Sequence, residues 1–486
     1  MSKTISRRTV VHTGVVGAAS VTLKPLAGPA LGALGANERI RLAVVGAGWR
    51  GGQLIDRFAP DKGVEIVYVA DPDTRLVSDR LEVVRKQSEG RSKPKGIQDA
   101  REALDDKRVD AVAIATPNHW HVLMTIWACQ ADKDVYVEKP LSHDIHEGRM
   151  VVQAARKHRR IVQHGTQSRS DMKWAKVAAA VKSGKLGKLR VARGLCYNAS
   201  DGFRTRASLG FKPVTAPPRE LDFNLWQGPA KWLGFHENLV HYRWHWFWAT
   251  GNGDIGNQGV HQLDILRWCI PNATLPRSVV SFGGRLGYED QGEVASTQVA
   301  VMDFGETQLV FEVRGLPSKP YRGQRVGTIL HLDEGTIVEG KFYPNGSKQP
   351  VPLPDVGHER GPGGDHFGNF LAAMRSRKVS DLNGDVLEGH NSAALCHLAN
   401  MSIRLGLKVP FTPRTQALAD TEAVDALKRM ETYLKENGID IERSGYVMGR
   451  KLAVDTEAER IIDDEEANAL LSRDYRKGFE VPQRIA

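Results

Sequence analysis

The sequence predicts an α/β protein with two main domains, a doubly wound parallel sheet followed by an α+β domain. The chain of 486 residues is too long for one small core. Between residues 38 and 165, short β-branched segments alternate with helical patterns, as in parallel βαβ units. Between residues 278 and 332, apolar and polar residues alternate instead, which predicts successive strands of a second sheet.

The composition excludes several classes of protein. Hydrophobic residues (41%) and charged residues (26%) occur at ordinary levels for a globular protein. The formal charge is +10, but four of the bases lie in residues 1–36, and no basic stripe interleaved with aromatics follows, so no nucleic-acid partner is expected. The cysteines are scattered among apolar residues, which favours buried small hydrophobes over disulfides, and no metal site is predicted. They are Cys129, Cys196, Cys269 and Cys396.

Residues 1–36 have the pattern of a targeting peptide. Arg7 and Arg8 stand directly before a weakly hydrophobic run, rich in Gly and Ala, that reaches about Leu23. The run is too short and too interrupted to span a bilayer, and no membrane insertion is expected after the peptide is removed. The paired arginines predict export by the twin-arginine route to the periplasm or another extracytoplasmic place. The alternative is a disordered basic N-terminus.

A glycine-rich turn follows the first strand of the parallel sheet. Residues 40–45 are apolar and end in Gly46-Ala47-Gly48-Trp49-Arg50-Gly51, after which an apolar-periodic helix begins. In this context, the glycines allow a tight turn and let the backbone approach a pyrophosphate at the positive end of the helix. We therefore predict a dinucleotide-binding domain, with this turn holding the phosphates.

An acid ends the second strand. Asp71 follows residues 64–70 and lies about 20 residues after the glycines, where a carboxylate accepts the ribose hydroxyls of a dinucleotide. The same carboxylate repels a phosphate on that ribose, so NAD is favoured over NADP, although Arg50 and Arg75 weaken this preference. The alternative for Asp71 is a turn or helix-capping residue.

The alternation continues with strands predicted at 111–115, 134–137 and 160–163 and with helices through Cys129 and near 144–158. Polar residues follow two of these strands, at the edge of the sheet where ligands of such folds bind. The residues expected beside the cofactor are Thr116, Asn118 and His121 after the third strand, and Glu138 and Lys139 after the fourth.

With Glu138-Lys139-Pro140 following the glycine-rich turn and Pro117-Asn118-x-x-His121, the chain resembles the Gfo/Idh/MocA family, which includes glucose–fructose oxidoreductase and inositol dehydrogenase. The resemblance covers roughly residues 38–410. It implies a Rossmann domain followed by an open, largely antiparallel sheet that carries the substrate on one face. It also implies a homo-oligomer, a dimer or tetramer, because the exposed face of that sheet often pairs in the family.

The resemblance places Lys139 beside the nicotinamide and the reacting hydroxyl. A lysine at the carboxyl end of a parallel strand reaches the switch-point crevice, where it can hydrogen-bond an alkoxide or act as a base if burial lowers its pKa. Glu138 is expected to support the lysine or the cofactor. The alternative for both residues is an ion pair in a surface loop.

A second family signature lies in the glycine-rich stretch 251–264. The chain matches it at His261 and Asp264, but the position of the family's catalytic aspartate holds Asn257. An asparagine can orient a hydroxyl but cannot take its proton. His261 must then act without an aspartate, or Asp254 approaches from another position; the alternative for His261 is a helix-entry hydrogen bond.

Residues 199–240 form a loop-rich insertion, and insertions of this length are usually functional or wrap a neighbouring surface. It leads into residues 241–248, where aromatics, an Arg and two His suit a polyhydroxylated ligand. Tyr242 and His245 are the favoured substrate-binding residues here, with a core or subunit contact as the alternative. A Pro/Gly-rich segment, residues 340–364, is expected to form another loop over the site.

These observations predict a signal peptide (1–36), an NAD-binding Rossmann domain (38–165), an α+β substrate and oligomerisation domain (166–415) and a C-terminal helical and surface extension (416–486). From about residue 440 the chain is expected to be a surface arm or an oligomer contact.

The leading hypothesis for function is hydride transfer to or from a sugar or polyol hydroxyl carbon. Lys139, His261 and Asn257 form the predicted catalytic set, and Tyr242, His245, Asp254 and His261 the predicted substrate site. Export implies a tightly held cofactor, because no pool of free NAD is evident outside the cytoplasm. The alternatives are a redox-neutral NAD-dependent glycosidase, working by oxidation, elimination, addition and reduction, and a non-catalytic binding or scaffold protein.

Overall fold

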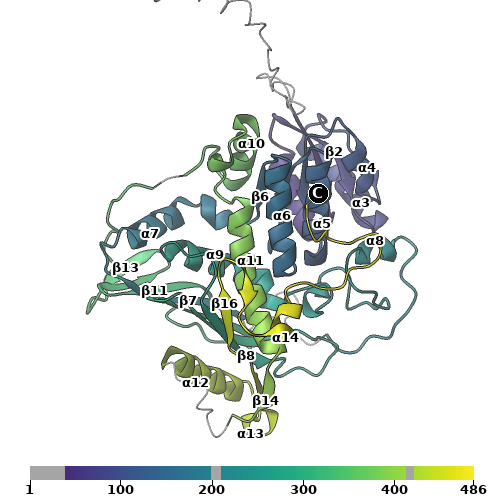
Figure 1. The fold of residues 1–486 in the computed structure, drawn as a ribbon. Helices are drawn as coiled ribbons and strands as arrows, with labels where there is room; N and C mark the ends of the chain where they lie inside the picture. The colour runs from purple at the N-terminus through teal and green to yellow at the C-terminus, as the bar shows by residue number, and fades with distance from the viewer. Residues whose placement is uncertain (1–38, 199–208, 359, 412–420, 486) are drawn as a thin grey trace, which may run out of the picture. The chain divides into compact units, whose positions relative to one another are not determined.

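The computed structural model describes residues 39–198, 209–358, 360–411 and 421–485. The predicted targeting peptide and Glu359 lie outside the described residues, as does part of the predicted insertion. Two sheets organise the described chain (Figure 1). Among the helices of that part of the chain, none combines the length and the apolar composition needed to cross a bilayer.

The first sheet has six strands, and every neighbouring pair is parallel. The spatial order is β3 (Lys95–Ile97), β2 (Val64–Ala70), β1 (Ile40–Val45), β4 (Ala111–Ile114), β5 (Asp134–Val137) and β6 (Val162–His164). This is the strand order of a Rossmann fold, and it confirms the predicted doubly wound sheet. Every residue of β4 and β5 is buried, as expected for strands covered on both faces. The helices are α2 (Trp49–Phe58), α3 (Thr74–Gln87), α4 (Arg101–Asp105), α5 (Asn118–Gln130) and α6 (Ile145–Lys157).

The second sheet is mixed and mostly antiparallel, as predicted, with β7 and β10 as its parallel pair. Its order is β13 (Lys341–Pro344), β12 (Gly335–Val338), β11 (Val326–Leu332), β7 (Leu189–Asn198), β10 (Gln308–Pro317), β9 (Thr297–Asp303), β8 (Ser278–Gly284), β15 (Tyr446–Met448) and β14 (Leu407–Val409). Two short strands extend it, β16 (Leu452–Asp455) beside β8 and β17 (Arg460–Ile461) beside β16.

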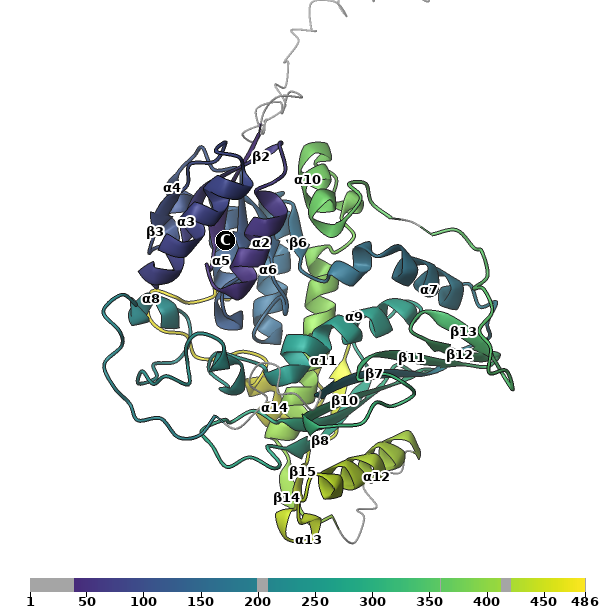
Figure 2. The ribbon, with the colours of Figure 1, turned by 180° about the vertical axis from the view of Figure 1, so that it is seen from behind.

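Helices lie on both faces of the second sheet (Figures 1 and 2). One face packs in a large apolar core against α7 (Met172–Lys182), α9 (Val260–Cys269) and α11 (Val386–Arg404). The other face contacts α12 (Thr421–Glu436), through an apolar cluster that includes Val299, Val310 and Leu427. The remaining helices are α8 (Phe223–Gln227), α10 (His366–Ser376), α13 (Ile441–Ser444) and α14 (Glu465–Ala469).

The position of α12 bears on the expected pairing of copies through the sheet. This helix of the same chain packs against β9 and β10 on the face that the resemblance assigns to pairing. An oligomer that uses this face must therefore form around α12 or across strands that α12 leaves uncovered. The homo-oligomer itself stays a prediction.

Two expectations about loops and termini differ from the structure. Residues 341–344 form β13 at the sheet edge, and none of the described residues of 345–364 lines the cavity described below, so this segment does not form a loop over the site. Residues after 440 are more than a surface arm, because β15 and β16 pair with β8. Phe479 and Val481 are buried in the core of the first domain.

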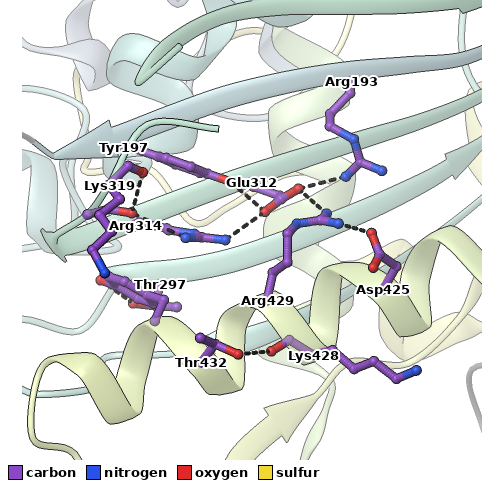
Figure 3. Close-up of polar contacts among 12 residues, drawn as sticks. Arg193, Tyr197, Thr297, Glu312, Arg314, Lys319, Asp425, Lys428, Arg429 and Thr432 are labelled. Carbon is purple, nitrogen blue, oxygen red and sulfur yellow. Dashed lines mark hydrogen bonds and ion pairs between the residues drawn. The ribbon is translucent and has the colours of Figure 1, made fainter. Parts of the chain in front are cut away.

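A buried ionic cluster connects the second sheet to α12 (Figure 3). The Glu312 carboxylate accepts hydrogen bonds from Arg193 (2.7 Å), Arg429 (2.6 Å), Arg314 (3.2 Å) and the Tyr197 hydroxyl (2.7 Å). Burial alone would raise the pKa of Glu312, but the three guanidinium groups outweigh it and the pKa is lowered from its usual 4.5. The ionised Glu312 therefore contributes its full stabilisation at pH values above the ordinary pKa of 4.5. This contribution is lost as the pH falls through the lowered folded-state pKa.

We expect Glu312→Gln to destabilise the protein by about 3–5 kcal/mol, because the buried arginines lose their shared counter-charge. Urea unfolding followed by circular dichroism measures the change. The matched control is Glu306→Gln, whose exposed carboxylate pairs with Lys188, and no resolvable change is expected there. Equal stability of the Glu312 variant and the control would show that the cluster does not hold α12 to the sheet.

Candidate active site

A cavity of about 830 Å³ lies between the carboxyl edge of the first sheet and the start of α9. Its volume is typical of ligand sites in proteins. Every residue predicted for the site lines it, apart from Gly51. From the first domain these are Gly46, Gly48, Trp49, Arg50, Asp71, Thr116, Asn118, His121, Glu138 and Lys139. From the second they are Tyr242, His245, Asp254, Asn257 and His261.

The three glycines of the turn have different physical roles. Gly46 has φ +91°, and a Cβ there would lie 2.6 Å from the Ala115 carbonyl oxygen. A Cβ at Gly51 would lie 1.8 Å from the Gly46 oxygen, so this glycine allows helix α2 to pack against the turn. Gly48 is different, because no atom of the described residues lies within 4 Å of the position of its Cβ. Gly48 thus leaves open space at the N-terminus of α2, where a pyrophosphate would be favoured.

Asp71 lies against this turn. One carboxylate oxygen accepts from the Ala47 N–H (2.8 Å), and the other from the Asp73 N–H (2.9 Å). Burial raises the pKa of Asp71, and the two N–H groups partly offset the effect. Each oxygen retains acceptor capacity for a ribose hydroxyl.

The two arginines that could favour NADP are both paired with acids. Arg75 binds Asp73 at 2.5 Å, and Arg50 binds Glu138 at 2.6 Å. The second pair also connects the glycine-rich turn to the residue before Lys139. These pairings leave Asp71 as the charged group at the position expected for the ribose and agree with the preference for NAD.

The residues that follow β4 divide into two kinds. Thr116 Oγ1 is buried and has no hydrogen-bond partner among the described residues, so it is available to a ligand. Asn118 and His121 line the cavity, but their polar atoms hold protein groups. Asn118 donates to the Asn252 side chain (2.8 Å), and the His121 ring nitrogens face the carbonyl oxygens of Pro140 (2.6 Å) and Thr116 (2.9 Å).

Lys139 follows β5 and reaches across to the second domain. Its Nζ donates to the backbone oxygen (2.8 Å) and the side-chain oxygen (3.0 Å) of Asn257. Burial lowers the pKa of Lys139; Glu138 raises it and Arg50 lowers it further, while the charge of Asp254 also raises it. The departure from the family pattern therefore lies at the lysine itself: its partner is a neutral amide.

Asn257 also orients the aromatic side of the cavity. Its Nδ2 donates to the Tyr242 hydroxyl at 3.2 Å. His245 Nδ1 lies 2.5 Å from the Tyr242 carbonyl oxygen, and the Trp244 ring stacks on His245 at 3.5 Å. Burial lowers the pKa of His245 to about 3, so its imidazole is neutral at physiological pH.

A π-helical turn, Ile255–Gly259, precedes α9 and holds Asn257, and His261 follows it in the first turn of α9. Such turns are frequent at functional sites. Burial, with Lys139 and Arg50 nearby, lowers the pKa of His261 to about 3. Asp264, which matched the family signature, does not line the cavity; it is buried and binds Arg169 at 2.9 Å.

Sequence reasoning missed several cavity residues. Trp120 and Trp127 lie on α5, whose apolar composition concealed them. Gln167 lies shortly after β6, and Asn198 is the last residue of β7. Trp226 lies on α8 within the loop-rich insertion. The sequence offered one indication that Trp226 is functional: it is a tryptophan in a segment with few periodic signals.

The cavity suits a dinucleotide on three observations. These are the open space at Gly48, the buried Thr116 hydroxyl without a partner in the described chain, and the Asp71 carboxylate beside the turn. The turn would hold the pyrophosphate, Asp71 the adenosine ribose, and Lys139 and Thr116 would face the nicotinamide half.

We expect Gly48→Val to fold normally but to bind NAD roughly 100-fold more weakly, a loss of about 2.8 kcal/mol. Gly48 has φ −63°, which any residue adopts, so the added side chain meets the ligand and not the protein. Calorimetric titration of cofactor-free protein measures the affinity, and thermal unfolding measures the fold. Gly51→Ala is the contrasting variant, since its methyl would clash with backbone and reduce stability. Unchanged NAD affinity in Gly48→Val would place the phosphates elsewhere.

Comparison with known proteins agrees with this geometry. Residues 40–166 match the family model described as an oxidoreductase family with an NAD-binding Rossmann fold, and residues 171–281 match the C-terminal alpha/beta domain of the same family. A segment of 169 residues, 34% of the chain, is 34% identical to an inositol 2-dehydrogenase of Rubrobacter xylanophilus and covers 46% of that protein. Another of 144 residues, 28% of the chain, is 31% identical to a glycosyl hydrolase family 109 protein of Shewanella pealeana and covers 31% of it.

The chain thus spans about half the length, or less, of these curated relatives. Among solved structures it is similar to the WlbA dehydrogenase from Bordetella pertussis, determined with NADH and UDP-GlcNAcA. The TM-score is 0.55 at 19% identity, over 76% of this chain and 97% of that one, which shows a shared fold. The first sheet of this chain is a Rossmann domain that matches the NAD-binding model of the Gfo/Idh/MocA oxidoreductase family, and part of the second domain matches the C-terminal model of that family.

Proposed function

We propose that this protein is an exported, NAD-dependent oxidoreductase that acts on a hydroxyl-bearing carbon of a sugar or polyol and keeps its cofactor tightly bound. The observation that carries the proposal is the lysine contact. The Lys139 amino group lies at the carboxyl edge of the NAD-binding sheet and is held by Asn257 from the substrate domain. One cavity thereby contains both the dinucleotide residues and a titratable amine.

Bound NAD would supply an acceptor or donor for hydride at the substrate carbon. The chain's own part is to manage the hydroxyl proton. Because burial lowers the pKa of Lys139, its amine has a larger neutral fraction than an ordinary lysine and can accept that proton. His261, with a pKa of about 3, is neutral and can position the hydroxyl by one hydrogen bond.

The other end of the cavity supports a polyhydroxylated substrate. Tyr242, Asn257 and His261 line it with neutral polar groups, and Trp244 and Trp246 add aromatic lining of the kind that suits the C–H groups of a sugar. Arg50, an arginine of the cavity lining, is paired with Glu138, which disfavours an acidic sugar. The inositol 2-dehydrogenase relatives support a polyol as well.

A second candidate function is a redox-neutral glycosidase. In it, a sugar hydroxyl is oxidised, the proton α to the new carbonyl is removed, the aglycone leaves, water adds, and the carbonyl is reduced again, so that NAD is restored. The family 109 glycosyl hydrolase relative favours this possibility. So does Asn257, because a site without the family aspartate suits modified chemistry. A scaffold without turnover is disfavoured by the intact Gly48, Asp71 and Lys139.

Export by the twin-arginine route rests on Arg7 and Arg8 and on the hydrophobic run after them. This route carries folded proteins, so the cofactor would be inserted before export. Fusion of residues 1–36 to a reporter, compared with the Arg7→Lys, Arg8→Lys pair, tests it. Loss of export in the variant supports the route, and unchanged export contradicts it.

The function is tested by recording the near-ultraviolet nicotinamide band of protein purified without added cofactor while sugars, polyols and aryl glycosides are titrated in. A lasting rise of the reduced band supports net oxidation. Aglycone release without a lasting rise supports the glycosidase. A protein that contains no nicotinamide and binds none when it is supplied would contradict both.

We expect Lys139→Ala to reduce turnover by about 10²–10⁴-fold while cofactor remains bound, since the loss is that of a positioned proton acceptor. Steady-state kinetics and the nicotinamide content measure the two effects. Lys173→Ala, on the exposed side of α7, is the control. Turnover at the wild-type rate in Lys139→Ala would show that the proton goes to another group.

We expect Asn257→Asp to move the acidic limb of the pH–rate profile upward by about 1–3 pH units. A carboxylate at 3.0 Å from Nζ favours the ammonium form of Lys139, so a higher pH is needed to free the base. The kcat/KM profile measures the shift. Asn345→Asp, on an exposed turn, is the matched control and should leave the profile unchanged. An Asn257→Asp profile identical to wild type would mean that Lys139 does not titrate in the reaction.

A further inference from the structure

One wall of the cavity comes from residues 209–248, the described part of the insertion, here called the strap. The strap contributes aromatic and imidazole side chains to the lining, among them Trp226, His241, Tyr242 and His245. The segment that supplies the predicted substrate-binding residues therefore also borders the dinucleotide half of the cavity.

The strap is anchored beside the ribose-binding acid. The Thr74 N–H donates to the Glu220 oxygen (3.1 Å), and the Asp222 N–H donates to the Pro72 oxygen (2.9 Å). His241 Nε2 lies 3.1 Å from an oxygen of Asp73, two residues after Asp71. These contacts fix the strap to the turn between β2 and α3.

A second anchor lies on α5. The Trp120 indole N–H donates to the Trp226 oxygen at 3.0 Å, and His119 Nε2 lies 3.0 Å from the same oxygen. Gly228 has φ +42°, and a Cβ there would lie 2.1 Å from the Trp120 ring, so the backbone of the strap runs directly against that ring.

Residues 471–485, here called the tail, hold the strap from the other side. Figures 1 and 2 show this yellow segment passing α8 on its way from α14 to the first domain. Arg476 donates to the Asn224 side chain and to its backbone oxygen (3.3 Å), and its guanidinium lies 5.3 Å from the Trp232 ring. Phe479 packs edge-on against Trp120 at 5.6 Å.

The tail is itself fixed by Arg473, whose side chain is 15% exposed. Arg473 pairs with Glu147 of α6 at 2.7 Å and donates to the backbone oxygens of His119 (3.2 Å) and Ala249 (3.0 Å). The tail thus connects α5, α6, the middle of the strap at Asn224 and the residue that follows the strap, Ala249.

We infer that the strap and the tail form a clasp that keeps the dinucleotide in the cavity between turnovers. The clasp deepens the proposed function and rests on its NAD site. A retained NAD that has been reduced by one substrate must be reoxidised in the same cavity, so the site has to accept a second, carbonyl-bearing molecule or the carbonyl it has just made.

The test measures the dissociation rate of NAD from the full-length, NAD-loaded protein by dilution into excess NADH and detection of the released NAD. Wild type is expected to release NAD slowly. Arg476→Ala removes the contact of the tail with the strap without touching the cavity lining, and a roughly tenfold faster release is expected. Asn224→Ala removes only the side-chain part of this contact, because Arg476 also reaches the Asn224 backbone oxygen and the Trp232 ring. A smaller increase is therefore expected, with little effect beyond that of Arg476→Ala in the double variant.

Arg443→Ala is the control, because this exposed arginine lies on α13, pairs with Asp440 and belongs to neither the strap nor the tail. Release from both contact variants at the rate of the control would overturn the clasp, as would rapid release from wild type. Thermal unfolding of each variant excludes a folding defect as the cause of faster release. The outcomes separate the two proposals. If the variants release NAD faster than wild type but sugars cause no change in the nicotinamide band, the clasp is supported and the proposed activity alone is contradicted. A protein that binds no NAD overturns both.

Discussion

The contact between Lys139 and Asn257 is the interaction on which the arrangement of the site depends. Lys139 follows strand β5 of the parallel sheet, and Asn257 lies in a π-helical turn of the other domain. Two oxygens of Asn257 accept hydrogen bonds from the amine, one from the backbone and one from the side chain. The position of the amine therefore depends on the backbone of the π-helical turn as well as on the Asn257 side chain. The amide nitrogen of Asn257 also donates a hydrogen bond to the Tyr242 hydroxyl. The amine that we propose as proton acceptor and the wall that we propose for the substrate are therefore positioned by the same residue.

The rest of the cavity is built by segments far apart in the chain. The strap joins the β2–α3 turn to α5, and the tail fixes the strap while packing Phe479 into the core of the first domain. Ionic groups with little exposure stabilise the tail and, separately, the junction between α12 and the second sheet. Arg473 meets Glu147, and Glu312 gathers three arginines where α12 covers the sheet. A cavity whose wall is anchored both to the first domain and to the tail is suited to a ligand that dissociates slowly.

Local sequence patterns predicted most of the elements and cofactor-site residues of the first domain. The glycine-rich turn, the acid after β2 and the lysine after β5 are set by neighbours in sequence, and their spacing predicted where they meet. Strand β7 was missed because Arg193 and Gly194 interrupt its apolar pattern; Arg193 is buried only because Glu312 and Glu422 neutralise it. The partners of Asn118 and His121, and the tail on the strap, depend on contacts more than 100 residues apart or on backbone oxygens. No sequence periodicity reports such contacts.

The neutral partner of Lys139 agrees with a resident cofactor on chemical grounds. An aspartate in that position would hold the lysine as an ammonium, which stabilises an alkoxide well but accepts a proton poorly. An amide at the same distance orients the amine without fixing its charge. Under the proposed function, the lysine then takes the hydroxyl proton when the substrate is oxidised and returns it when a carbonyl is reduced. A site that must run both half-reactions on one bound nucleotide gains from a base whose ammonium form is not stabilised by a carboxylate at this position, and the asparagine in place of the family's aspartate leaves that stabilisation out.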